Sequence, residues 1–208
     1  MSEPENIFQF RLTLTDSFPE IWRRVLVPDE CTLGDLHYVI SYSFCWFQDS
    51  SHEFTLGSRT FGPKDKDASS EREDEHKAFL STIFRRPGHD IRYVYSLRDE
   101  WSVDVTFEGE QAPVPRGHYP CCIDGNNGGP PDGVGGISRY NEVARLLDDP
   151  KARHALAPGC DEVGWSDFEP AYLDIGDINC ALGLIFPAGD AEYPPVNPGP
   201  SGCRVNAN

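Results

Sequence analysis

The sequence predicts an α+β protein. Its core is a β-grasp-like mixed sheet (a hairpin, a helix and further strands), followed by a helical C-terminal extension. Three observations support this class: apolar residues alternate with period two near the N-terminus, one amphipathic segment follows them, and helical spacing returns after residue 139. We expect residues 1–186 to form a single domain. Residues 187–208 are rich in Pro and Gly, and we expect them to be a disordered tail.

The first element is an opening hairpin. A turn over residues 15–20 separates its two strands, and the second strand covers residues 21–27, which are rich in β-branched and aromatic side chains. Arg23 and Arg24 are neighbours in this second strand, so we expect their side chains to point to opposite faces of the sheet. In the first strand, apolar residues alternate with polar ones at Phe8, Phe10, Leu12 and Leu14.

A capped helix follows the hairpin. Thr32 is a favourable N-cap residue, and Asp35 stands three residues later to complement the first turn. Further strands are expected at residues 52–56, and then at 91–97 and 101–107 as a second hairpin. The apolar residues that recur at helical spacing after Thr32 are Leu33, Leu36, Val39, Ile40 and Phe44.

Two segments are expected to be irregular. Residues 63–77 are charged and small, and we expect a solvated loop there that grades into a helix over residues 71–84. Gly and Pro crowd residues 121–136 so densely that we expect one specific loop shape there, and neither a helix nor an ordinary strand. This Gly/Pro loop either ties the sheet to the helical extension or presents a rigid rim to a partner.

The helical extension contains two short helices. The first covers residues 140–147 and ends before Pro150. The second carries apolar residues at helical spacing over residues 178–185, and Asp177 is its expected cap.

The charge of the chain argues against one broad class of partner, although a DNA-associated protein stays a second alternative. The sequence has 18 Lys and Arg against 34 Asp and Glu, a net charge of −16. Because binding to a phosphate backbone needs clustered basic side chains, we expect no nucleic-acid partner. No apolar run approaches the roughly 20 residues that span a bilayer, and the N-terminus has no signal-peptide pattern. The seven cysteines, an odd number, are expected to be reduced thiols of a cytoplasmic protein with no membrane partner.

Five sequence blocks resemble, in order, the plasmid pRiA4b ORF-3-like family, and the resemblance extends from about residue 8 to residue 184. The blocks are IWRRV (21–25), TLGDLH (32–37), SHEF (51–54), GPPDGVGG (129–136, with Tyr140) and the closing segment 168–179. The resemblance implies an association with mobile elements and no particular reaction. Older resolvase-type labels imply DNA recombination, which the acidic charge and the lack of a basic arm do not favour.

The chain departs from the family pattern in two places. Members carry a Tyr-Asp-Phe-Gly-Asp-x-Trp-x-His-like strand turn, whereas residues 95–103 read YSLRDEWSV, without the Gly and the His. The Gly/Pro loop of the family often reads Pro-Pro-Glu-Asp with nearby Cys, but here Asp132 is followed by Gly133 and Val134. These departures argue against a function that needs that His or those thiols.

Enzymatic chemistry is an alternative interpretation. A small hydrolase or metal-dependent enzyme would use His37 and His52 with an acidic residue such as Asp49 or Asp132, because imidazole titrates near neutrality and can activate a nucleophile. We expect no bound metal, because structural zinc sites usually show two close Cys pairs and none occurs in the sequence. The best ligands would otherwise be Cys121, Cys122, His52 and His118.

We interpret the chain as a non-enzymatic binding module for an unknown protein or small ligand, without a cofactor, and as a candidate accessory protein of a plasmid or mobile element. The two arginines beside Trp22 either contact an anionic partner or form an internal salt bridge to Asp132 or Asp124. The candidate binding residues, expected around one loop-lined cleft, are Trp22, Arg24, His52, Trp101, Asp132 and Tyr140.

Overall fold

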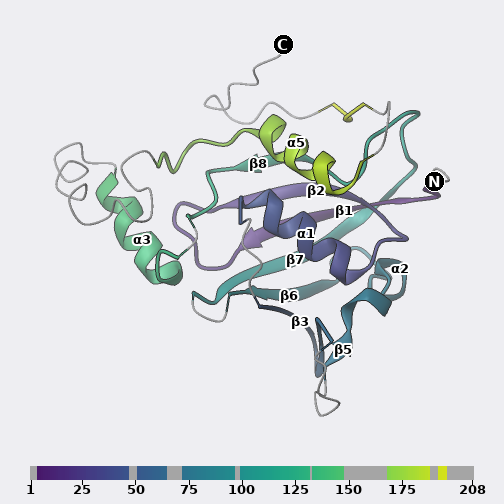
Figure 1. The fold of residues 1–208 in the computed structure, drawn as a ribbon, viewed down its shortest axis with the longest axis horizontal. Helices are drawn as coiled ribbons and strands as arrows, with labels where there is room; N and C mark the ends of the chain where they lie inside the picture. The colour runs from purple at the N-terminus through teal and green to yellow at the C-terminus, as the bar shows by residue number, and fades with distance from the viewer. Residues whose placement is uncertain are drawn as a thin grey trace.

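In the part of the chain that the structure describes, the fold is one mixed sheet of eight strands with helices packed on it, in the order β5-β4-β3-β6-β7-β1-β2-β8 (Figure 1). A computed structural model describes residues 4–46, 51–64, 72–96, 99–131, 133–147, 168–187 and 192–195. The strands are β1 (Ile7–Leu14), β2 (Trp22–Pro28), β3 (His52–Leu56), β4 (Arg59–Gly62), β5 (Glu73–Asp74), β6 (Asp90–Tyr95), β7 (Trp101–Gln111) and β8 (Cys121–Asn126). The helices are α1 (Leu33–Ser43), the 3-10 turn η1 (Glu75–Lys77), α2 (Leu80–Ile83), α3 (Gly136–Leu147) and α5 (Ile175–Ile185). The predicted α+β class is confirmed.

Both predicted hairpins are present in the sheet. β1 and β2 pair antiparallel, with Thr13 opposite Trp22 and Ile7 opposite Pro28. β6 and β7 form the second hairpin, and β1 also pairs antiparallel with β7, so the two hairpins become one sheet. The parallel pair β4–β5 makes the sheet mixed. The narrower β-grasp-like arrangement stays a prediction.

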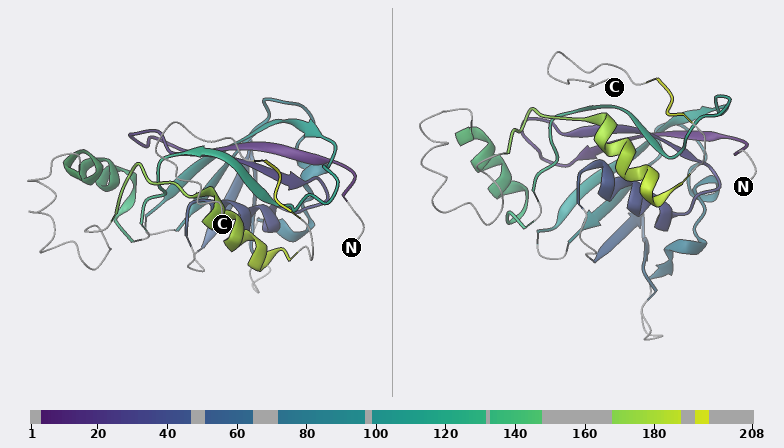
Figure 2. Two further views of the ribbon diagram at one scale, coloured as in Figure 1. Left: turned by 90° about the horizontal axis from the view of Figure 1, so that it is seen from above. Right: turned by 45° about the horizontal axis from the view of Figure 1, so that its top comes forward.

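The helices α1, α2 and α5 cover one face of the sheet. α1 and α5 lie side by side across it (Figures 1 and 2). α2 packs on the same face, because the ring of Phe84 at its end lies 4.7 Å from the ring of Phe10. α3 lies beyond one end of the strands (Figure 1). In the described ranges, no helix has the length and apolar character that crossing a membrane requires.

Period-two alternation in β1 sends Phe8, Phe10, Leu12 and Leu14 to the helical face, where all four are buried. α1 begins with the predicted cap. The backbone N–H of Asp35 donates to Thr32 Oγ1 at 3.2 Å, and the N–H of Thr32 donates back to Asp35 Oδ2 at 2.8 Å. This capping box satisfies two donors of the first turn and fixes where the helix starts over the sheet.

Two boundaries of the C-terminal half differ from the sequence-based expectation. Cys121–Asn126, expected inside the Gly/Pro loop, is strand β8 and pairs with β2. Gly and Pro become dense only from Gly128 onward, so the preceding residues can extend the sheet. The last helix is capped by Asp174 and not by Asp177, whose N–H donates to Asp174 Oδ1 at 3.0 Å.

The charged segment 63–77 was expected to be a solvated loop, and the structure corrects this in part. Residues 73–77 form β5 and η1, and Glu75 is buried. The predicted helix over residues 71–84 is limited to η1 and the short helix α2. Residues 65–71 lie outside the described part of the chain, as do residues 188–191 and 196–208 of the predicted tail.

Candidate functional site

The predicted site residues lie on two faces of the sheet. Trp22 and Arg24 flank Arg23, whose side chain points into the helical face, so both point to the opposite face. His52, Trp101 and Tyr140 are buried on the helical side. Asp132 lies outside the described residues. We call the surface opposite α1, α2 and α5 the helix-free face; its residues are Gln9, Arg11, Thr13, Trp22, Arg24, Asp104, Thr106, Glu108 and Asp124.

Trp22 is held between two arginines on the helix-free face. The guanidinium carbon of Arg11 lies 4.0 Å from the centroid of the indole ring, and that of Arg24 lies 5.3 Å from it. Cation–π contacts of this kind restrict the orientation of the ring. Trp22 is half-buried, so an oriented part of its indole remains open to solvent.

Arg24 is itself fixed by two carboxylates. Its Nε and Nη2 donate to the two carboxylate oxygens of Glu108 at 2.7 and 3.0 Å, and its Nη1 donates to Asp124 Oδ2 at 2.9 Å. The hydrogen bond from Arg24 is the main cause that lowers the pKa of Glu108. The predicted salt bridge to Asp124 is therefore confirmed, although Asp124 belongs to β8 and not to the loop.

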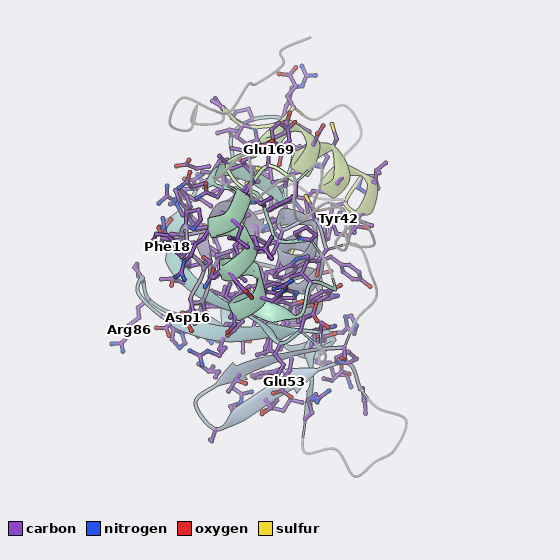
Figure 3. All side chains as sticks on the ribbon, turned by 90° about the vertical axis from the view of Figure 1, so that its left-hand side faces the viewer. Asp16, Phe18, Tyr42, Glu53, Arg86 and Glu169 are labelled. Atoms are coloured by element: carbon purple, nitrogen blue, oxygen red, sulfur yellow. The ribbon has the colours of Figure 1, made fainter. Side chains whose placement is uncertain are left out.

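Phe18 extends this surface, and no pattern in the sequence pointed to it. It lies in the turn between β1 and β2, and 63% of its surface is exposed. The turn is fixed by α3: the N–H of Phe18 donates to Asn141 Oδ1 at 2.8 Å, and Asn141 Nδ2 donates to the carbonyl of Asp16 at 2.7 Å. Figure 3 shows Phe18 on the side of the molecule away from Tyr42, a residue of α1. A turn has no side-chain periodicity, so the pattern could not reveal which way Phe18 points.

Arg23 has a different role, on the helical face. It is 1% exposed, and its Nε donates to the carbonyl of Ser43 at the end of α1 at 2.8 Å. Its Nη1 donates to the carbonyls of Trp22 at 2.8 Å and Asn126 at 3.0 Å. This buried guanidinium joins the C-terminus of α1 to β2 and β8. Its positive charge interacts favourably with the negative end of the α1 dipole, and its hydrogen bonds hold this end of the sheet together. The prediction that Arg23 and Arg24 point to opposite faces is confirmed.

Aromatic side chains fill the core at that end of the sheet. Trp46 stacks on Tyr95 and on Trp101, with ring centroids at 5.0 and 5.8 Å. Trp46 Nε1 donates to the carbonyl of Pro130 at 3.1 Å, which attaches the Gly/Pro loop to this stack. A Cβ on Gly129 would overlap the backbone of Phe44, so the loop packs there only with glycine.

The histidines predicted for an enzyme lie together in a buried polar cluster. The rings of His37 and His52 stack with centroids at 3.5 Å and an interplanar angle of 5°. His52 Nε2 lies 2.8 Å from Glu75 Oε2, and His37 Nδ1 lies 2.7 Å from the hydroxyl of Tyr93. Ser41 Oγ donates to the carbonyl of His37 at 2.9 Å. The carboxylate partner is Glu75 of η1, whereas the candidates from the sequence, Asp49 and Asp132, lie outside the described residues.

Burial determines what this cluster can do. His37 is 6% exposed and His52 7% exposed. Desolvation, with a smaller contribution from His52, lowers the pKa of His37 to about 3, so its imidazole is neutral near pH 7. Desolvation also raises the pKa of Tyr93 well above its ordinary value. The cluster has the carboxylate–imidazole pair of an acid–base centre, but a substrate has little access to it.

The predicted alternative metal ligands have separate environments. Cys122 belongs to the main core, whereas Cys121 packs in a small cluster under Tyr119 on the other side of β8. His118 Nε2 lies 2.9 Å from the carbonyl of Phe186. Burial raises the pKa of both thiols, that of Cys122 to about 11. Within the described ranges, no group of three or more His, Cys, Asp and Glu side chains could hold a metal ion.

Comparisons with known proteins agree with one another. The model of the plasmid pRiA4b ORF-3-like protein family matches residues 6–177. The chain is 26% identical over 178 residues to the uncharacterized protein y4hQ of Sinorhizobium fredii (strain NBRC 101917 / NGR234), covering 85% of this chain and 91% of that protein. The crystal structure of the protein of unknown function MM3350 from Methanosarcina mazei Go1 is similar with a TM-score of 0.73 and 29% identity, covering 84% of this chain and 98% of that one.

Proposed function

Because the chain belongs to the plasmid pRiA4b ORF-3-like protein family, whose similar proteins named above carry no stated activity, we propose a function from the structure itself. The chain is a protein-interaction module, and its partner contacts the helix-free face around Trp22. The observation that carries this proposal is the half-exposed indole of Trp22, oriented by Arg11 and Arg24 on a sheet face that α1, α2 and α5 leave uncovered.

Three features of this surface support binding. Trp and Arg are the residue types that most often dominate the energy of protein interfaces. Arg24 is already fixed by Glu108 and Asp124, so little conformational entropy is lost when a partner docks. Phe18 adds a second exposed aromatic side chain at the edge of the same surface. His52, Trp101 and Tyr140 are buried on the helical side and do not form part of this surface, and Asp132 stays a predicted contact residue.

The charges of the face favour a protein over a nucleic acid. Arg11 and Arg24 are neutralised by Glu20, Glu108 and Asp124, and the chain carries a net charge of −16. Such a surface has no basic patch that would release counterions from a phosphate backbone. Family membership supports a role as an accessory protein of a plasmid or mobile element. The five described cysteines are unpaired, which supports a cytoplasmic location.

Site-specific photo-cross-linking tests this function. A photoreactive amino acid replaces Thr106, which faces Arg11 across the β1–β7 ladder. As a control, a second variant carries the photoreactive amino acid in place of Glu142, an exposed position of α3. In cells of the native host, we expect a discrete protein adduct from position 106, lost when Trp22→Ala is added and kept with Trp22→Phe. An adduct from position 142 alone, or one that Trp22→Ala leaves unchanged, would show that the partner binds elsewhere.

Acid–base chemistry at the histidine cluster is a second candidate, supported by the 2.8 Å contact between His52 and Glu75. Hydrolysis of p-nitrophenyl acetate tests it. The candidate requires a rate above buffer that His52→Gln abolishes and that His89→Gln, a histidine outside the cluster, leaves unchanged. A rate equal to that of buffer, or equal rates for both variants, removes it.

A further inference from the structure

Buried polar atoms without a partner gather at one end of the sheet. Within the described residues, they include both carboxylate oxygens of Asp99 and the indole Nε1 of Trp101. Thr15 Oγ1 and Ser102 Oγ belong to the same set, and the N–H of Thr15 donates to the carbonyl of Ser102 at 2.8 Å. All four residues lie where β1 ends and β7 begins. Because folded proteins pair nearly all of their buried polar atoms, such a concentration needs a partner that the described residues do not supply.

Asp99 is the charged member of this set. It is 6% exposed, and its backbone N–H donates to Ser96 Oγ at 3.4 Å. The backbone N–H of Asp99 is therefore paired, while no described residue donates to its carboxylate. Burying a carboxylate without a donor is among the most costly arrangements in a folded protein. A donor that binds from outside would remove this cost.

The turn between β6 and β7 holds Asp99 in this position. Ser96 and Glu100, on either side of it, have φ angles of 60° and 50°, in the left-handed region that side chains other than glycine rarely adopt. The N–H of Glu100 donates to the carbonyl of Ser96 at 2.7 Å and closes the turn. A Cβ on Gly136, the first residue of α3, would lie 2.7 Å from the carbonyl oxygen of Asp99. Backbone strain of this kind concentrates at ligand sites.

Aromatic rings surround the base of the turn. Tyr95 and Trp101 are cross-strand partners at the ends of the two strands that it connects, and Trp46 stacks on both. A buried carboxylate without a described donor suits an organic cation, because the carboxylate supplies the opposite charge and accepts the hydrogen bonds of the cation. Asp99 would repel an anion. A hard metal cation needs several oxygen ligands, and the described residues contain no group of three or more side chains that could hold one.

We propose that Asp99 anchors an organic cation, a primary ammonium or guanidinium group, at the end of the sheet beside α3. A free amine and the Lys or Arg side chain of another protein present the same chemical group. Both carboxylate oxygens are covered, so a ligand must displace neighbouring groups to reach them, and association is slower than diffusion. The proposal does not depend on the helix-free face.

Thermal unfolding of the full chain tests the proposal. The probes are n-butylammonium chloride, n-propylguanidinium chloride and the peptide acetyl-Gly-Lys-Gly-amide, each compared with NaCl at equal ionic strength. At about five times Kd, binding raises the Tm of the wild-type chain by about 2–4 °C. Asp99→Asn shows no such rise. The matched control Asp104→Asn, on the helix-free face of β7, responds like the wild type. Without a ligand, Asp99→Asn is at least as stable as the wild type, because it removes an unpaired buried charge.

A second measurement keeps the test decisive if Asp99→Asn does not fold. The indole N–H resonance of Trp101, assigned with Trp101→Phe, is followed in the wild-type chain by nuclear magnetic resonance. A saturable shift with n-butylammonium supports a free amine as the ligand, and a shift with the peptide alone supports a side chain of a partner. The proposal is wrong if no probe changes the Tm or this resonance more than NaCl does. It is also wrong if Asp99→Asn responds as the wild type does. Trp22→Ala must leave the response intact, which separates this site from the helix-free face.

Discussion

Arg23 and Arg24 are adjacent in β2, yet they belong to two regions with different roles. Arg23 is buried under α1 and donates to three backbone carbonyls. Arg24 lies on the helix-free face, where it pairs with two carboxylates and contacts Trp22. The first guanidinium joins parts of the fold, and the second orients a side chain that is open to solvent. The face that an arginine occupies, and not its residue type, therefore decides whether it joins backbone segments or faces solvent in this sheet.

The largest effect expected from this comparison is on folding stability. Arg23→Leu leaves the carbonyls of Ser43 and Asn126 without their buried donor, so we expect the free energy of unfolding to fall by about 3–5 kcal/mol. Arg24→Leu removes a partly exposed ion pair with Glu108 and Asp124 and should cost about 1 kcal/mol. Urea unfolding followed by circular dichroism measures both. Equal losses would mean that the two faces do not differ in this way.

The histidine cluster extends the comparison to a second buried site. Glu75→Leu leaves His52 Nε2 without its partner in the core, and we expect a loss of about 2–3 kcal/mol in the free energy of unfolding. Glu73→Leu is the control, because its ion pair with Arg59 is about half exposed and should contribute less than about 1 kcal/mol. A smaller loss for Glu75→Leu than for Glu73→Leu in urea unfolding would contradict a structural role for the cluster.

The pH dependence of stability tests the burial of His37. Its pKa is lowered to about 3 in the folded chain, against an ordinary value of 6.5. Between these values the unfolded chain binds more protons, so stability falls as the pH falls below about 6.5, and the loss is complete only near pH 3. From pH 6.5 to 5 this contribution is about 2 kcal/mol. Urea unfolding at several pH values should show a flatter dependence for His37→Gln, and His89→Gln should keep the slope of the wild type.

Much of the fold could be predicted from the sequence, because it follows from local patterns. Alternation of apolar residues defines β1, a capping box defines the start of α1, and the period of a strand separates Arg23 from Arg24. The pairing of Glu75 with His52 could not be predicted, because it joins two segments 23 residues apart and Glu75 stands in a run of charged residues.

The site was harder to predict than the fold for a related reason. Which face of the sheet stays uncovered depends on where α1, α2 and α5 pack, and no strand pattern records that. The sequence therefore grouped Trp22 with Trp101 as if they faced one cleft, whereas they point to opposite faces. That no described residue donates to the carboxylate of Asp99 is likewise visible only when its neighbours in space are known.

Trp22→Ala is expected to change the folding stability little and the affinity for a partner strongly. Trp22→Ala removes a half-buried ring and should lower the free energy of unfolding by about 1 kcal/mol. Tyr38→Ala removes an exposed aromatic ring from α1 and is the matched control on the opposite face. Thermal unfolding of both variants should show two folded proteins with a Tm within a few degrees of the wild type.

The affinity of the cross-linked partner for these two variants shows whether Trp22 lies in the interface. Isothermal titration of the purified partner should give a Kd for Trp22→Ala that is about 30-fold weaker than for the wild type, the loss of about 2 kcal/mol typical of a central interface tryptophan. Tyr38→Ala should bind as the wild type does. Unchanged binding by Trp22→Ala, with a loss for Tyr38→Ala, would place the interface on the helical face and contradict an interface around Trp22.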